Sequence, residues 1–149
     1  MGQKENSDST VQKNAEKIIL KKLSLMLGVP LKEPEKPIVL KCKLDGFHDS
    51  SRPICVEVFA RQGKSLAGQK KKIMSDMCKL LLVEKKLGKP CMKVIAVSDT
   101  ESVLFLQNSW MGVFAQEFGI DILCVDISDA QRSKIKNAQS KQKMTNVEL

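Results

Sequence analysis

Two carboxylate residues, twelve positions apart, carry the most chemical content in this chain of 149 residues. Asp45 is followed by Gly46, and Glu57 lies inside the apolar run 54–60. Each occupies or ends a strand-like segment, and two carboxylates on neighbouring strands can hold a divalent cation on one face of a sheet. A metal held there can activate water for attack on a phosphodiester.

Each carboxylate also has an explanation without a metal. Asp-Gly is a common turn dipeptide, so turn chemistry alone accounts for Asp45 and Gly46. Glu57 is harder to explain, because a carboxylate among apolar neighbours needs a charged partner or a metal. The alternative partners are cations across the sheet: Lys41, Lys43 and Arg61.

Four segments are expected to position these two residues. Apolar residues at helical spacing predict a helix over 14–27, and alternation predicts a strand over 38–44. A turn-rich stretch separates it from a second strand over 54–61, so the two strands should be adjacent and antiparallel. A long apolar stripe predicts a helix over 66–87 that covers one face of the sheet.

The remainder of the chain alternates strand and helix. We expect a strand over 93–98, a helix over 99–118 and a buried strand over 120–127, paired in parallel through crossovers. Residues 1–12 are polar and predicted to be disordered, 13–128 to form a single domain, and 129–149 to be a basic tail with a short helix from Ala130.

Composition and charge limit the classes of partner. The net charge of +8 and the pI near 9.3 favour a polyanion, with nucleic acid first and an anionic membrane surface also consistent. The apolar runs are far shorter than the roughly 18–20 residues of a membrane span. Five irregularly spaced cysteines argue against a disulfide framework or a zinc site, and for a cytoplasmic location.

The order of elements, with Asp-Gly closing one strand and a glutamate in the middle of the next, resembles the PD-(D/E)XK nuclease superfamily. The resemblance covers about residues 14–127. It implies an α/β, restriction-endonuclease-like three-layer fold. In that fold a central mixed sheet is flanked by helices, with an αβββαβ core order.

The resemblance also implies roles for individual residues. Asp45 and Glu57 match the family's metal ligands, with Mg²⁺ or Mn²⁺ as the cofactor. Glu16 and Gln69 match a first-helix glutamate and a helix glutamine that support such sites. Phe59 stands where the family has its lysine, so this chain departs from the motif at that position.

Another cation is therefore needed if the chain is catalytic. Lys70 is the first candidate, because it begins the long helix and some family members recruit this cation from there. Lys64, in the loop after Gly63, is the second. Arg61 shares the face of Glu57 along the strand and is the third.

Two functions stay open on this basis. One is divalent-metal-dependent hydrolysis of nucleic acid, DNA in the first place. The other is a catalytically inactive nuclease-fold module that binds nucleic acid or assembles with partners, for instance as a homodimer. Trp110 is expected in the core, or else as an interface anchor. The phosphate contacts are expected from Lys43, Lys70, Lys71 and Lys72, with a competing site in the tail (Arg132, Lys134, Lys136, Lys141, Lys143).

Overall fold

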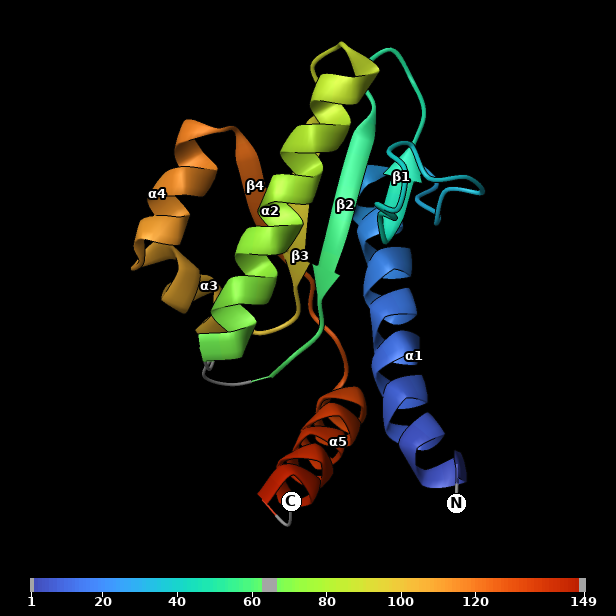
Figure 1. Ribbon diagram of the computed structural model, residues 1–149, viewed down its shortest axis with the longest axis vertical. Helices are drawn as coiled ribbons and strands as arrows, with labels where there is room; N and C mark the ends of the chain where they lie inside the picture. The colour runs from blue at the N-terminus through green and yellow to red at the C-terminus, as the bar shows by residue number, and fades with distance from the viewer. Residues whose placement is uncertain (1, 63–66, 148–149) are drawn as a thin grey trace.

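The computed structural model describes residues 2–62 and 67–147, which form a four-stranded mixed sheet flanked by helices (Figure 1). Among these residues no helix has both the length and the apolar character needed to cross a membrane. The elements in chain order are α1 (Gly2–Leu27), β1 (Gly46–His48), β2 (Ile54–Phe59), α2 (Ala67–Leu87), β3 (Met92–Val97), α3 (Thr100–Gln107), α4 (Trp110–Glu117), β4 (Ile120–Cys124) and α5 (Asp129–Val147).

The strands follow one another in the sheet in the order β1-β2-β3-β4. β1 pairs with β2 antiparallel, whereas β2, β3 and β4 are mutually parallel. Parallel neighbours need a crossover of a dozen or more residues, and α2 supplies the first while α3 and α4 supply the second. The parallel pairing predicted for the C-terminal strands is confirmed.

Both faces of the sheet are buried, which is why the central strands are almost continuously apolar. Side chains alternate along β2: Cys55 and Phe59 pack toward α2, α3 and α4, whereas Val56 and Val58 pack toward α1 and α5. The helices therefore form a layer on each side of the sheet, as the fold prediction requires.

α2 lies across β2 and β3 and supplies most of the apolar cover of one face (Figure 1). Its buried residues recur at helical spacing: Ile73, Met77, Leu80 and Val83 are wholly inaccessible. Gly88 ends the helix with a φ of 69°, in the left-handed region that favours glycine. The predicted amphipathic helix is thus confirmed, from Ala67 onward.

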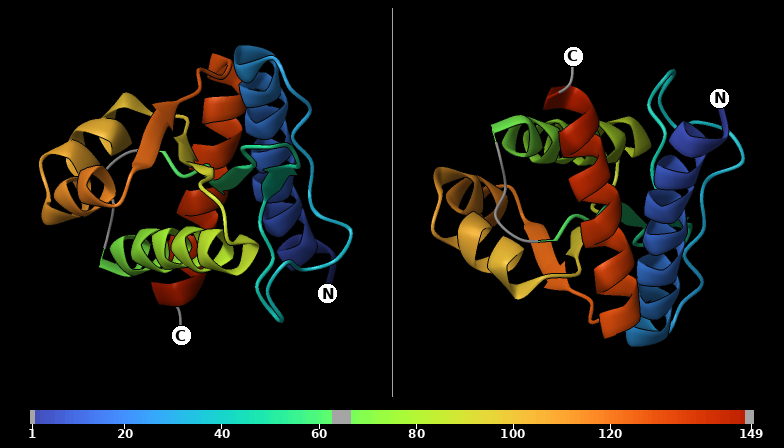
Figure 2. Two further views of the ribbon diagram at one scale, coloured as in Figure 1. Left: turned by 90° about the horizontal axis from the view of Figure 1, so that it is seen from above. Right: turned by 90° about the horizontal axis from the view of Figure 1, so that it is seen from below.

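α1 and α5 lie side by side and cover the other face (Figure 2). α1 begins at Gly2, so the disorder expected over 1–12 is not what the structure shows where it describes that segment. Once a helix has nucleated, adding residues is cheap, and Val11 near its start lines a cavity with Ile135 of α5.

The segment 129–149 is more than a basic tail. α5 extends to Val147, and Ile135 and Ala138 belong to the core. Arg132 docks the helix, because its guanidinium donates to the side-chain oxygen of Gln62 at 3.0 Å and pairs with Asp126 at 2.6 Å. Arg132 therefore has a structural role, which was not predicted from the sequence.

The strand predicted over 38–44 is wrong. Val39 and Cys42 form only an isolated bridge around Lys41, whose φ is 62°, and Leu40 is 85% exposed. β1 forms later, within the predicted loop, because Phe47 exchanges backbone hydrogen bonds of 2.8 and 3.2 Å with Lys32 on its outer side. Two strands, and not the three of an αβββαβ order, precede α2.

The single helix predicted over 99–118 is two helices. Asp99 caps α3 by accepting from the N–H of Glu101, and the chain turns at Asn108 and Ser109 before α4. A side chain at Gly112 would collide with the carbonyl oxygen of Leu106, so glycine permits the close approach of α4 to α3. Trp110 is 67% exposed, which corrects the core position expected for it.

Candidate active site

Strand register brings the two predicted carboxylates together. Gly46 of β1 pairs with Val56 of β2, and continuing this antiparallel register by one residue sets Asp45 opposite Glu57. Residues directly opposite in an antiparallel pair project from the same face, with their Cβ atoms about 5 Å apart. The pair therefore lies on the side of the sheet that α2 covers.

The Asp45 carboxylate is held in place at both of its ends. Its Oδ2 accepts a hydrogen bond of 2.8 Å from the backbone N–H of Val58, and its side chain is hydrogen-bonded to that of Glu57. Two carboxyl groups share a hydrogen bond only when one of them carries a proton. Gly46 completes the arrangement, since any side chain there would collide with the end of Leu20 on α1.

Glu57 is one of the most buried charged residues of the described chain, with 2% of its surface exposed. Burial, followed by the negative charge of Asp45, raises the pKa of Glu57 from its ordinary 4.5 to about 9. At neutral pH the pair Asp45–Glu57 therefore retains a proton. Strongly raised pKa values of this kind mark functional sites in many enzymes.

Lys79 of α2 provides the cation of the site. Its ammonium lies 2.9 Å from Oε1 of Glu57 and 4.0 Å from Oδ1 of Asp76. Oε1 of Glu57 is buried and accepts no hydrogen bond of good geometry from the described residues, so the attraction to Lys79 is ionic. Burial lowers the pKa of Lys79, but the contact with Glu57 outweighs it and the net change is upward.

Asp76 and Lys79 were not anticipated from the sequence. With Lys72, whose ammonium is 3.4 Å from Oδ2 of Asp76, they form a polar row at spacings of four and three residues along α2. The row runs beside the buried stripe that begins at Ile73. Burial raises the pKa of Asp76, although Lys72 and Lys79 act in the opposite direction.

Glu16 reaches the same cluster from α1. Burial and then the charge of Asp45 raise the pKa of Glu16, while Lys72 opposes the rise. This half-buried glutamate lies one turn before Leu20, the residue that packs on Gly46. The structure places Asp45 opposite Glu57, and it places Glu16 of α1 close enough for the charge of Asp45 to raise the pKa of Glu16. We refer to Glu16, Asp45, Glu57, Asp76 and Lys79 as the acidic cluster.

Of the three cations proposed to replace the motif lysine, the two that the structure describes, Lys70 and Arg61, form no ion pair with Glu57. Lys70 points elsewhere, with its ammonium 5.0 Å from the ring centroid of Phe105. Lys64 lies outside the described residues. Arg61 lines a separate cavity with Gln69 and Lys72, near the beginning of α2. The cation beside Glu57 comes from the middle of α2, because that is the part of the helix that crosses β2.

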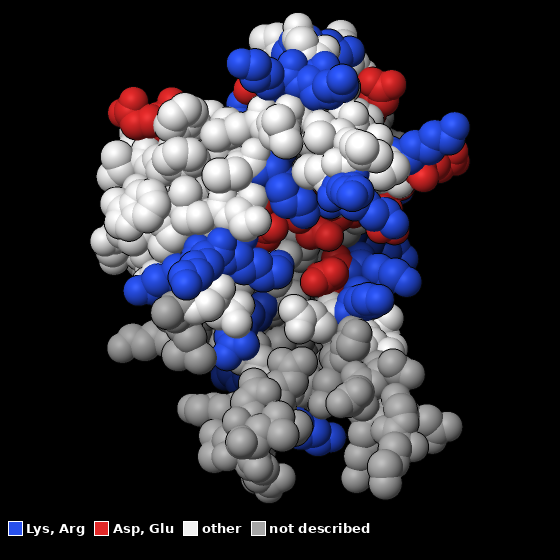
Figure 3. All heavy atoms as spheres, viewed as in Figure 1, with Lys and Arg blue, Asp and Glu red and all other residues white. Residues whose placement is uncertain are grey.

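The remaining lysines expected to contact phosphate differ in their surroundings. Lys43 forms an exposed ion pair of 2.7 Å with Glu33, and Lys71 is exposed on α2. Lys72 lies 5.9 Å from the ring centroid of Phe59, the residue at the motif position. Figure 3 shows acidic side chains gathered between α2 and α1, with lysine and arginine side chains around them. This pattern suits a polyanion that tracks the basic surface past an acidic centre.

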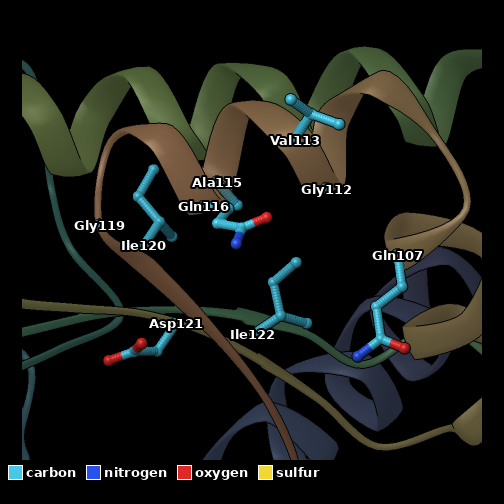
Figure 4. Close-up of a pocket in the computed structure, with 9 residues that line it drawn as sticks. All are labelled: Gln107, Gly112, Val113, Ala115, Gln116, Gly119, Ile120, Asp121 and Ile122. Carbon is cyan, nitrogen blue, oxygen red and sulfur yellow. The ribbon is translucent and has the colours of Figure 1, made fainter.

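A second hollow, of about 500 Å³, lies between α4 and β4 (Figure 4). Gln107, Gly112, Gln116 and Asp121 are among its lining residues. It shares no residue with the acidic cluster and has no cation among its lining residues. The catalytic chemistry is therefore not expected there.

The acidic cluster combines a proton-retaining carboxyl pair, a cation and a basic surround. Among the described residues, no group of three or more histidine, cysteine, aspartate or glutamate side chains is arranged to hold a metal. Asp45, directly before β1, and Glu57 of β2 are the two carboxyl groups that lie opposite each other in the acidic cluster. Comparison of the chain with protein-family models, with curated proteins and with solved structures gives no match.

Proposed function

We propose that this chain is a divalent-metal-dependent nuclease of the restriction-endonuclease-like fold, in which Lys79 takes the place of the lysine missing at Phe59. The observation that carries the proposal is the contact between the Asp45–Glu57 pair and Lys79 on one face of the sheet. The proposed substrate is nucleic acid, DNA in the first place, because the surround is basic.

The donor set fits Mg²⁺ or Mn²⁺ better than a metal with an all-protein cage. Mg²⁺ is commonly held by one or two carboxylates and keeps several waters, and Asp45 and Glu57 supply two. Burial and then the charge of Asp45 raise the pKa of Glu57, so an ionised Glu57 needs a neutralising partner, and a divalent cation would be such a partner. A bound metal would supply a Lewis acid and a water of lowered pKa.

The protein's own groups have distinct tasks in this proposal. Asp45 is fixed by the N–H of Val58, so the position of its carboxylate does not depend on a bound ligand. Lys79 would donate to a phosphate oxygen and stabilise the charge that develops there, because its side chain is 31% exposed while that of its partner is buried. Glu16 and Asp76 raise the negative potential of the site and favour a cation.

A non-catalytic module is the second candidate, and one observation favours it. The Lys79 ammonium lies 2.9 Å from Oε1 of Glu57, so the buried carboxyl pair has a cationic neighbour without a metal. In that case the fold would bind nucleic acid through its basic surface alone. Charge removal at Lys70, Lys71 and Lys72 would then flatten the salt dependence of binding, with charge removal at the exposed Lys134 and Lys136 of α5 as the comparison.

Metal-dependent cleavage distinguishes the two candidates. Wild type, Glu57→Gln and Glu84→Gln are incubated with single- and double-stranded DNA and RNA in the presence of Mg²⁺ or Mn²⁺, or of a chelator. We expect cleavage by wild type with metal only, no cleavage by Glu57→Gln and retained cleavage by Glu84→Gln. Glu84 is a matched control, because it pairs with Lys93 at 2.6 Å away from the acidic cluster. Wild type that cleaves none of these substrates would establish the non-catalytic candidate.

A further inference from the structure

A cavity of about 160 Å³ lies where the end of β2 meets α1, α2 and α5. Two cationic residues, Arg61 and Lys72, line it together with the amide side chains of Gln12 and Gln69. The wall opposite is apolar and includes Ile135. Among the described residues that line it there is no aspartate or glutamate, so its charged lining residues are both cations.

Arg61 gives this cavity an unsatisfied donor. Its Nε is buried and has no hydrogen-bond partner among the described residues. A buried donor without an acceptor is costly, and an oxyanion is the partner that guanidinium groups bind best. Arg61 follows β2 by two residues, so the rigid sheet fixes where the guanidinium begins.

The α5 wall of the cavity is hydrogen-bonded to the chain after β2, and the cavity adjoins the acidic cluster. The Gln139 side chain forms its α5 wall and is held by two hydrogen bonds with the backbone of Gln62, of 2.9 and 3.2 Å. Lys72 connects the two regions, because it lines the cavity and its ammonium lies 3.4 Å from the carboxylate of Asp76 in the acidic cluster. An anion in the cavity would thus lie about one helical turn of α2 from the carboxylates.

We infer that this cavity binds the terminal phosphate monoester of a nucleic-acid strand. The inference rests on the proposed function, since it places the end of the substrate next to the cluster that would cleave it. A monoester carries a charge of about −1.5 to −2 at neutral pH, which matches two cations better than the single charge of a diester. Walls from four elements suit a group that enters end-on, whereas a strand passing through would need two openings. The chain is accordingly an end-directed enzyme.

Binding of the full-length protein to one labelled oligonucleotide in three forms tests this inference. The forms carry a 5′-phosphate, a 3′-phosphate or hydroxyls at both ends, and fluorescence anisotropy is recorded in chelator so that no cleavage occurs. We expect one phosphorylated form to bind about 10-fold more tightly than the hydroxyl form, the usual effect of a charge-assisted contact. Arg61→Ala should abolish that difference, while the exposed Arg52→Ala should preserve it.

Gln69→Glu is the second variant, because it adds a negative charge to the cavity without removing a buried group. Glutamate in the first turn of α2 favours the helix, so the protein should fold, and the preference for a phosphorylated end should still be lost. Equal affinity of all three forms for wild type would overturn the inference. So would full competition by inorganic phosphate or a mononucleotide with no preference among oligonucleotides, which would assign the cavity to a free phosphate compound.

The two proposals fail separately. A protein that prefers phosphorylated ends in chelator but cleaves nothing with metal would support phosphate binding in the cavity and contradict the proposed nuclease activity. A protein that cleaves with metal but shows no preference for the end group would support the proposed nuclease activity and contradict phosphate binding in the cavity. Glu57→Gln should therefore retain the end preference while it loses cleavage.

Discussion

The ammonium of Lys79 lies 2.9 Å from Oε1 of Glu57, and the two residues come from helix α2 and from β2, the strand that precedes it. Phe59, the residue two positions after Glu57, is 3% exposed and packs in the core on the same side of the sheet. The motif position is therefore occupied by an apolar side chain, while the Lys79 ammonium reaches the Glu57 carboxyl group from α2. The cation beside Glu57 thus comes from Lys79 of α2 and not from position 59 of β2. Substitutions at these two positions can therefore test the proposed catalytic role.

Removing Lys79 should lower the rate of metal-dependent cleavage by about 10²-fold, the usual effect of losing one electrostatic stabiliser of a transition state. Lys86→Ala, in the exposed last turn of α2, is the matched control and should leave the rate unchanged. Single-turnover cleavage rates check both variants, with melting temperatures recorded alongside. A Lys79→Ala protein that folds and cleaves at the wild-type rate would refute this role.

Phe59→Lys in the Lys79→Ala background tests whether the two positions are equivalent. Position 59 lies on the same face of β2 as Glu57, the face that Lys79 contacts, so the new lysine should restore part of the lost rate. It also places a charge in the core, and a loss of stability of about 1–3 kcal/mol is expected. Cleavage rates of the double variant and of each single variant measure the coupling. A folded double variant no faster than Lys79→Ala would contradict the equivalence.

Stability should fall as the pH rises through neutrality. The folded state holds a proton on Glu57 up to a pKa of about 9, whereas the unfolded chain loses it near 4.5. The folded state therefore binds more protons between these two pKa values, and the free energy of unfolding decreases with pH across that window. Glu16 and Asp76 shift in the same direction and add to the slope.

Glu57→Gln removes the largest contributor and should flatten this dependence. The variant should equal or exceed wild type in stability at alkaline pH by about 1–2 kcal/mol, because an amide has no charge to desolvate. Urea unfolding at several pH values, with Glu33→Gln at an exposed position as control, measures the effect. Parallel pH profiles for wild type and Glu57→Gln would show that Glu57 does not bind the proton.

Metal binding should show the opposite dependence on pH. A divalent cation has to displace the proton from the Asp45–Glu57 pair, so its apparent affinity rises as the pH approaches the pKa of about 9. The thermal shift caused by Mg²⁺ or Mn²⁺ should thus be larger at about pH 8.5 than at about pH 6.5. Glu57→Gln should show no shift at either pH. A wild-type shift that is independent of pH would place the ion elsewhere.

Trp110 offers a direct test of the predicted homodimer. It is the only tryptophan and is 67% exposed, with Val113 of the same helix 58% exposed. Emission from the monomer should resemble that of free tryptophan and be quenched readily by iodide. If α4 is the interface, the emission should shift to shorter wavelength and become protected at high protein concentration, and Val113→Asp should reverse both effects. Unchanged emission across concentrations would exclude α4 as the contact.

The sequence predicted best those elements whose pattern depends on burial alone. The continuous apolar runs around β2, β3 and β4 and the stripe of α2 reflect contact with the core on a fixed period. The run 38–44 alternates equally well, yet Leu40 is exposed and β1 pairs with Lys32 on its outer edge. Periodicity could not reveal this, because two short segments compete to be the edge strand. The outcome depends on a contact with another part of the chain, here the pairing of Lys32 with Phe47.

The candidate site was predictable only in part, for a similar reason. Asp45 and Glu57 could be identified because a strand glutamate among apolar neighbours demands a partner. Lys79 could not, since its relevance depends on where α2 crosses β2. The available signal was a row of charged residues beside the buried stripe of α2, formed by Lys72, Asp76 and Lys79. This row indicates a polar side of the helix, but it does not identify Glu57 as the residue that Lys79 contacts.

The pairing of α1 with α5 also bears on how the protein is made. Synthesis runs from the N-terminus, so every strand emerges from the ribosome before the residues of α5. Val94 and Val125 lie in the same buried cluster as Ile135, on the face that α1 and α5 share. Before α5 is made, this cluster lacks the apolar residues that α5 contributes, and collapsed chains with such exposed surface are prone to aggregate. Synthesis of α5 therefore completes the cover of this face, and a chain stalled before α5 would depend on chaperones to stay unaggregated.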